Sequence, residues 1–208
     1  MLRRTRRLFG TVLIAALLFA VRTPLMRLAG HALAAEDPLA ASDVVVVPQW
    51  AGDAGALEAV DLVRGGYAQR VAVLLVPDDA AEAELRRRGI PVDDFHNWLT
   101  HVIATLGVAV QNISNAANGT EAESDLLPAW CTRNGVRSII VVSTADHSRR
   151  VRRVLRRTMA GRGIRVIVRE AGYSEFNPDA WWKSRGGART EIVEFEKLAL
   201  DVLRHPLN

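Results

Sequence analysis

The chain alternates between short apolar runs and segments whose apolar positions recur at helical spacing. The runs are apolar at almost every position, which predicts five buried strands, at 43–47, 71–76, 108–113, 138–142 and 164–168. The other segments predict helices, at 54–64, 79–89, 93–106, 120–134, 147–159 and 188–203. Strands that are apolar on both faces and joined by helices form parallel sheets covered on both sides. The pattern therefore predicts an α/β domain with a doubly wound, mainly parallel five-stranded sheet of the Rossmann-like type.

A further apolar run, Leu8–Val21, precedes this domain and follows four arginines within the first seven residues. At 1.5 Å per residue the run spans about 21 Å as a helix, which is shorter than the roughly 30 Å hydrocarbon core of a membrane. This length is typical of a signal peptide, and Thr5-Arg6-Arg7-Leu8-Phe9 is similar to a twin-arginine export signal. Ala32-Leu33-Ala34 would be the cleavage site.

The stretch between Val21 and that site is long for a signal peptide and carries Arg22 and Arg27. We therefore favour an uncleaved membrane helix, lengthened by arginines that reach the headgroups, over a cleaved signal. An amphipathic helix on the inner surface is the third alternative. The sequence thus predicts an anchor or signal segment at 1–35 and an α/β domain at 36–208. The leading arginines predict a single pass through a bacterial inner (plasma) membrane, with the N-terminus cytoplasmic and the domain on the outer or periplasmic side.

Composition restricts the class of protein and the class of partner. A hydrophobic share of 49% and a charged share of 24% exclude a disordered chain. Cys131 is the single cysteine, which excludes an intrachain disulfide, and we expect a buried structural thiol. The net charge of +4 suits anionic partners: lipid headgroups, phosphorylated small molecules or nucleic acid.

The strongest candidate site directly follows the fourth strand and opens a helix. In such folds ligands bind beyond the carboxyl ends of the strands, and a helix N-terminus favours an anion. The segment contains two hydroxyls, Ser143 and Thr144, then His147 as a candidate acid or base, and Arg150 as a phosphate ligand. The alternative is that Thr144 or Asp146 only caps the helix.

Two other segments at the same edge supply further candidates. Thr120-x-x-Glu123 opens a helix, where the two residues either bind ligand or form a capping box. Asp53 lies in the first loop, Pro48–Gly55, which contains glycines but neither a Walker loop nor a dinucleotide motif. We include Asp53, Thr120 and Glu123 among the ligand-binding candidates, and we predict no metal site and identify no cofactor.

The helix after His147 carries six arginines around one apolar stripe. A solvated surface is the ordinary explanation of such a charge run, and contact with anionic lipid is the functional alternative. Nucleic-acid binding is disfavoured because no aromatic residues interleave with the arginines. Trp181-Trp182 would lie at a membrane interface or cover a pocket.

These segments together resemble the DUF218 family, also called YdcF-like or SanA/ElyC-like proteins. Ser143-Thr144-x-x-His147-x-x-Arg150 resembles the family's T-S-x-Y-H-x-x-R motif, and Thr120 to Glu123 resembles its T-x-x-E helix start. The closing segment from Trp181 to Ala188, with Glu194 and Lys197, is also similar. The resemblance implies a Rossmann-type domain, often behind one membrane helix, in cell-envelope biogenesis and in the handling of lipid-carrier or peptidoglycan precursors.

The chain departs from that family at three places. Pro48-Gln49-Trp50 replaces the glycine pair after the first strand, Asp146 replaces the tyrosine before the histidine, and an arginine near Gly55-Ala56 is missing. The first loop is therefore expected to bind a different ligand from that of its relatives, or none.

The leading hypothesis is a membrane-anchored cell-envelope protein that binds a phosphorylated or anionic metabolite, such as a lipid-carrier phosphate. If it is an enzyme, it hydrolyses or transfers a phosphoryl-linked group, with His147 as acid or base. The alternative is a non-catalytic adaptor that acts through its basic helix. A cytoplasmic nucleotide-dependent enzyme is the third hypothesis.

Overall fold

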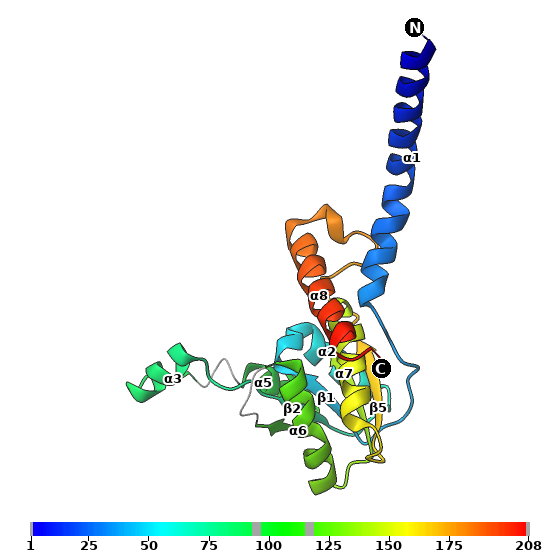
Figure 1. The fold of residues 1–208 in the computed structure, drawn as a ribbon. Coiled ribbons are helices and arrows are strands. Elements are labelled where there is room, and N and C mark those ends of the chain that lie inside the picture. The colour runs from blue at the N-terminus through cyan, green and yellow to red at the C-terminus, as the bar shows by residue number, and fades with distance from the viewer. Residues whose placement is uncertain (1, 93–96, 115–118, 207–208) are drawn as a thin grey trace.

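A computed structural model describes residues 2–92, 97–114 and 119–206, with side chains for residue 17 and from residue 19 onward (Figure 1). The strands are β1 (Val44–Pro48), β2 (Val71–Leu74), β3 (Val110–Ile113), β4 (Ser138–Ser143) and β5 (Arg165–Glu170). The α-helices are α1 (Leu2–Leu33), α2 (Gly52–Arg64), α3 (Ala80–Arg87), α5 (Trp98–Thr105), α6 (Thr120–Arg133), α7 (Ala145–Met159) and α8 (Arg185–Arg204). Two short 3-10 helices are η1 (Gln49–Ala51) and η2 (Trp181–Lys183).

The five strands form one parallel sheet in the order β3-β2-β1-β4-β5. The chain builds the sheet outward from β1 to β3, then returns to the other side of β1 for β4 and β5. This order confirms the predicted five-stranded parallel α/β sheet. It also places the topological switch point between β1 and β4, where Val45 pairs with Ile140.

Successive side chains of each strand enter two separate cores, one on each face of the sheet. Val45 and Val47 pack with α2 and α5 in the first core. Val44 and Val46 pack with α6 and α7 in the second, which also contains the fully buried Cys131. Burial on both faces explains why the strands are apolar throughout. In the second core, burial also raises the pKa of the Cys131 thiol to about 11.

Helix α7 begins two residues earlier than the predicted 147, directly after β4. Thr144 is extended, with φ −70° and ψ 152°, and Ala145 already starts the helix. Residues 93–96 of the predicted helix at 93–106 lie outside the described residues, and α5 covers Trp98–Thr105. The strand-to-helix junction at Thr144 is therefore very short, which holds the first turn of α7 at the carboxyl edge of the sheet.

The first helix, α1, is continuous over Leu2–Leu33 and projects away from the sheet, while its C-terminal end packs on the domain (Figure 1). Leu33 is 1% exposed, and Trp181 Nε1 donates a hydrogen bond to the Met26 carbonyl at 2.7 Å. Gly30 lies so close to the Pro178 carbonyl that a Cβ atom there would overlap it. Among the described residues, no helix is both long enough and apolar enough to cross a membrane.

Candidate functional site

The candidate site lies at the switch point, beyond the carboxyl ends of β1 and β4. Trp50 and Ala51 follow β1, and Thr144 follows β4. Two cavities open here and share Trp50, Thr144 and Asp146 in their walls. Their position is the one at which open parallel α/β sheets bind ligands.

His147 is the centre of the smaller cavity, of about 470 Å³. Its Nδ1 atom is 2.7 Å from Glu194 Oε2, and its Nε2 atom is 3.2 Å from Thr120 Oγ1. A carboxylate only accepts hydrogen bonds, so the Glu194 contact assigns the proton of the neutral ring to Nδ1. Nε2 is then the unprotonated nitrogen, and it contacts both the Thr120 hydroxyl and, at 3.0 Å, the Arg150 guanidinium.

Trp50 covers this imidazole from the β1 side. Its ring meets the His147 ring edge-on, with centroids 4.4 Å apart, and its Nε1 donates to Glu123 Oε2 at 2.7 Å. The His147 side chain is 12% exposed as a result. Trp50, the third residue of the loop Pro48-Gln49-Trp50, is therefore a wall of the site.

Glu194, on α8, is shared by three nitrogen-bearing side chains. His147 contacts one carboxylate oxygen together with Arg150, and Lys197 donates to the other at 2.7 Å. Burial alone would raise the pKa of Glu194, but the hydrogen bond and charge of His147, with those of Lys197 and Arg150, outweigh it and lower that pKa to about 2. Glu194 is thus a carboxylate at neutral pH.

Thr120 and Glu123 do not form the capping box that was the alternative at this helix start. The N-cap residue of α6 is Gly119, and no side-chain capping bond is present there. Thr120 Oγ1 instead accepts a hydrogen bond from Arg150 at 3.0 Å and contacts His147. The first turn of α6 therefore contributes its side chains to the cavity.

The seven predicted site residues divide into three groups. Five of them line the smaller cavity: Thr120, Glu123, Thr144, His147 and Arg150. Ser143 is fully buried, and its hydroxyl donates to the Thr144 carbonyl, so it does not face the cavity. Asp53 lines the neighbouring cavity and accepts a hydrogen bond from Trp98 Nε1 at 2.8 Å.

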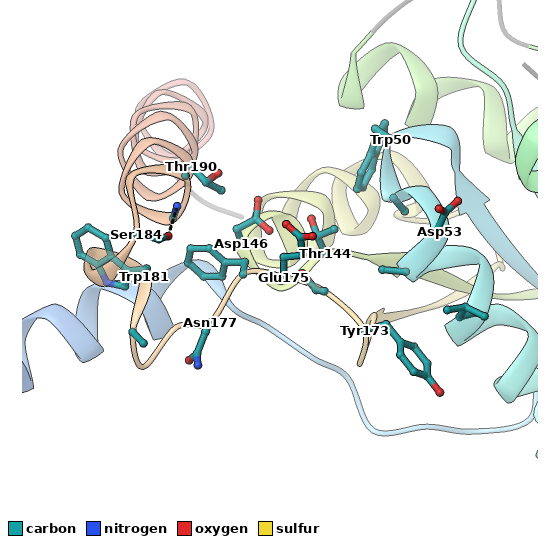
Figure 2. Close-up of a pocket in the computed structure, with 18 residues that line it drawn as sticks. Trp50, Asp53, Thr144, Asp146, Tyr173, Glu175, Asn177, Trp181, Ser184 and Thr190 are labelled. Atoms are coloured by element: carbon teal, nitrogen blue, oxygen red, sulfur yellow. Dashed lines mark hydrogen bonds between the residues drawn. The ribbon is translucent and has the colours of Figure 1, made fainter. Parts of the chain in front are cut away.

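The neighbouring cavity, of about 730 Å³, has acidic and aromatic walls. Its carboxylates are Asp53, Asp146 and Glu175, and no arginine, lysine or histidine of the described residues lines it. Figure 2 shows Asp146 and Glu175 between α8 on one side and α2, which carries Asp53, on the other. Burial raises the pKa of Asp146, against the opposing hydrogen bond from Thr144.

Glu191, one turn before Glu194, has no such partners. It is 3% exposed, and neither carboxylate oxygen has a hydrogen-bond partner among the described residues. Burial, with the nearby charge of Asp146, raises the pKa of Glu191. The pKa values of two glutamates on one face of α8 are therefore shifted in opposite directions, upward for Glu191 and downward for Glu194.

The α7 arginines are not the solvated surface that their sequence pattern suggests. Arg149 donates to the carbonyls of His31 and Ala34, and Arg152 and Arg156 pair with Asp37. Further along the helix, Arg153 and Arg157 pair with the buried Asp201 of α8. The expectation of a solvated helix was wrong for all of these arginines but Arg156, which is 62% exposed, because the end of α1, the segment after it and α8 cover the other side chains.

A group of potential metal ligands lies outside these cavities: Glu121 on α6, Asp201 on α8 and His205 directly after α8. Arg157 already pairs with both Glu121 and Asp201. The guanidinium supplies the positive charge that these carboxylates need, so the group is explained without a metal ion.

Trp50, Glu194 and Lys197 line the site but were not among the predicted site residues. The available signal was the helical spacing of Glu191, Glu194 and Asp201, which places three acids on one face of the last helix, the face that the structure buries. Neither known family models nor curated protein sequences match this chain.

Proposed function

We propose that this chain is a membrane-anchored cell-envelope protein whose α/β domain binds a phosphorylated or otherwise anionic metabolite at His147 and Arg150. The observation that carries the proposal is the convergence of Thr120, His147 and Arg150 on one cavity at the switch point. A lipid-carrier phosphate is the ligand that the resemblance to DUF218 favours.

Arg150 and Lys197 are the cations of the smaller cavity and the candidate ligands of an anion. Both pair with Glu194; of the other two carboxylates in the wall, Glu123 accepts a hydrogen bond from Trp50, and burial raises the pKa of Asp146. The first turns of α6 and α7 also meet here, and their backbone N–H groups lack partners within the helix. A phosphate oxygen would accept from Arg150 and from these amides.

The orientation of His147 supports chemistry as well as binding. Glu194 holds Nδ1, so Nε2 is aimed at the cavity and can exchange a proton with a reacting oxygen. We propose hydrolysis or transfer of a phosphoryl-linked group as the reaction.

The anchor is proposed on the four leading arginines and the apolar run Leu8–Val21. Packing at the end of α1 supports an uncleaved helix. The Ala35 backbone amide donates to the buried Ser148 hydroxyl at 2.8 Å, and Leu33 is buried. Both residues lie next to the Ala32-Leu33-Ala34 site and belong to the folded domain.

A thermal-shift measurement on the full chain in detergent tests the binding site. The compounds are inorganic phosphate, short-chain isoprenyl phosphates, sugar phosphates, nucleotides and S-adenosylmethionine. A ligand at 100 times its Kd should stabilise the fold by about 2.7 kcal/mol. We expect an isoprenyl or sugar phosphate to do so, and Arg150→Gln to abolish the shift.

Arg189→Gln is the matched control, because Arg189 is an exposed arginine on α8 outside both cavities. This variant should shift as the wild type does. Equal shifts in Arg150→Gln would place the anion elsewhere. The absence of any shift from well-folded wild-type protein would favour the adaptor hypothesis.

A further inference from the structure

Three side chains from three helices form a continuous chain of contacts in the smaller cavity. Thr120 Oγ1 lies 3.2 Å from His147 Nε2, and His147 Nδ1 lies 2.7 Å from Glu194 Oε2. They come from α6, α7 and α8, so only the folded domain brings them together. The order hydroxyl, imidazole, carboxylate is the arrangement that activates a hydroxyl nucleophile, whatever the fold.

Among the described residues, no structural hydrogen bond explains the position of the Thr120 hydroxyl. It does not cap α6, whose N-cap residue is Gly119. Its hydrogen bonds within the described part of the chain are to Arg150 and His147, two residues of the same cavity. Arg150 donates to Oγ1 at 3.0 Å, and a positive charge there favours the developing alkoxide.

The other hydroxyls near His147 lack this geometry. Ser143 and Ser148 are fully buried, and their hydroxyls bond to protein groups other than the ring. Thr144 lines the cavity, but its recorded bond to His147 runs between backbone atoms. Within the part of the chain that the structure describes, Thr120 is the hydroxyl in contact with the imidazole.

We infer that Thr120 is the nucleophile of the proposed reaction, with His147 as its base and Glu194 as the residue that positions His147. The inference rests on the proposed function, which it extends to a covalent intermediate on Thr120. The substrate class is then a phosphate ester or diphosphate with a group that can leave from phosphorus.

In the first step His147 Nε2 takes the proton of the Thr120 hydroxyl while Oγ1 bonds to phosphorus. The bond from phosphorus to the leaving oxygen breaks, and that oxygen takes the proton from Nε2. In the second step water or an acceptor hydroxyl gives its proton to Nε2 and bonds to phosphorus. The bond from phosphorus to Oγ1 then breaks, and Oγ1 regains the proton.

Glu194 supports both steps without transferring a proton. Its low pKa of about 2 keeps it ionised, so it can stabilise the imidazolium that forms transiently at His147. Arg150 and the first-turn amides of α6 are placed to bind the phosphoryl oxygens as charge develops on them.

The test is covalent labelling of the full chain in detergent with an alkyl fluorophosphonate, followed by peptide mass mapping. Attack of Thr120 on this probe forms the oxygen–phosphorus bond and releases fluoride. We expect the adduct on Thr120 in the wild type. Thr120→Ser should still be labelled, at position 120, whereas Thr120→Val should not be labelled. His147→Gln should slow labelling by about 100-fold or more.

Thr132→Val is the matched control, because Thr132 is an exposed threonine on the same helix. It should label at the wild-type rate. An adduct on another residue, or none on Thr120 in folded wild-type protein, would overturn the inference even if phosphates bind through Arg150. Conversely, labelling of Thr120 in protein that binds no phosphate would support Thr120 as a nucleophile with His147 and Glu194, and would reject the phosphorylated ligand.

Discussion

Two buried glutamates, one helical turn apart on α8, show how far the surroundings of a residue decide its charge. Glu194 meets His147, Arg150 and Lys197, and its pKa falls to about 2 despite burial. Glu191 meets no hydrogen-bond donor among the described residues, and burial raises its pKa. The first is held as an anion by its partners, whereas the second is favoured in its neutral form.

Replacing Glu191 with glutamine should therefore stabilise the protein in a pH-dependent manner. A carboxyl whose pKa is raised by folding stabilises the folded state below its unfolded pKa, near 4.5, and this contribution is lost as pH rises through the folded pKa. Glutamine stays neutral throughout. In denaturant titrations Glu191→Gln should match the wild type at pH 4 and exceed it at pH 8 by on the order of 1 kcal/mol, the typical cost of a buried polar group without partners.

Glu196→Gln, an exposed change on the same helix, should show no such pH dependence. A difference between Glu191→Gln and the wild type that is the same at both pH values would contradict the assignment of Glu191 as a destabilised buried acid.

At the level of elements, α7 serves two sides of the molecule. Its first two turns supply His147 and Arg150 to the cavity, and its other arginines bind the segment that follows α1. Asp37 is the centre of that segment. It pairs with Arg152 and Arg156, and it accepts a hydrogen bond from the Val168 amide of β5 at 3.0 Å.

Asp37→Asn should destabilise the domain by about 1 to 3 kcal/mol, because it leaves a partly buried guanidinium without its counter-charge. Asp179→Asn is the control: its ion pairs with Arg27 and His31 are more than half exposed. That variant should stay within roughly 0.5 kcal/mol of the wild type. Similar stabilities of the two variants in urea titrations would show that the α7 arginines do not hold this segment.

At the scale of the whole molecule, the last turns of α1 pack on the α/β domain. They lie just before residue 35, after which the sequence predicts the boundary between anchor and domain. Arg149 donates to the Ala34 carbonyl, and the Trp181 indole donates to Met26. The domain therefore includes the C-terminal end of the helix that projects from it in Figure 1.

Two truncations test this boundary. A fragment of residues 22–208 should be as stable as the full chain and should leave the membrane fraction, because it lacks Leu8–Val21. A fragment of residues 35–208 should be less stable by about 2 kcal/mol or more, since it loses the buried Leu33 side chain. Fractionation and thermal unfolding give the two readouts.

Equal stability of the two fragments would mean that the end of α1 is dispensable for folding, and processing after Ala34 would again be compatible with the fold. Release of the full chain from membranes by a carbonate wash would contradict the proposed anchor.

Much of the fold and part of the site were predictable because their signals are local. Apolar runs and helical spacing depend on neighbouring residues, and they determined the strands, most of the helices and the parallel sheet. The rule that ligands bind at the carboxyl ends of strands then selected the segment that contains His147 and Arg150, which the structure places in one cavity.

What only the tertiary structure decided is which distant side chain each of these residues meets. Thr120 and Glu194 lie 27 and 47 positions from His147, and their contacts depend on how α6 and α8 pack against α7. Local spacing allowed Thr120 and Glu123 to be a capping box, and it allowed the α7 arginines to face solvent. In the folded domain Thr120 contacts His147, Glu123 contacts Trp50, and the α7 arginines contact carboxylates and carbonyls. Buried polar groups need partners, and these partners come from the elements that the fold places beside them.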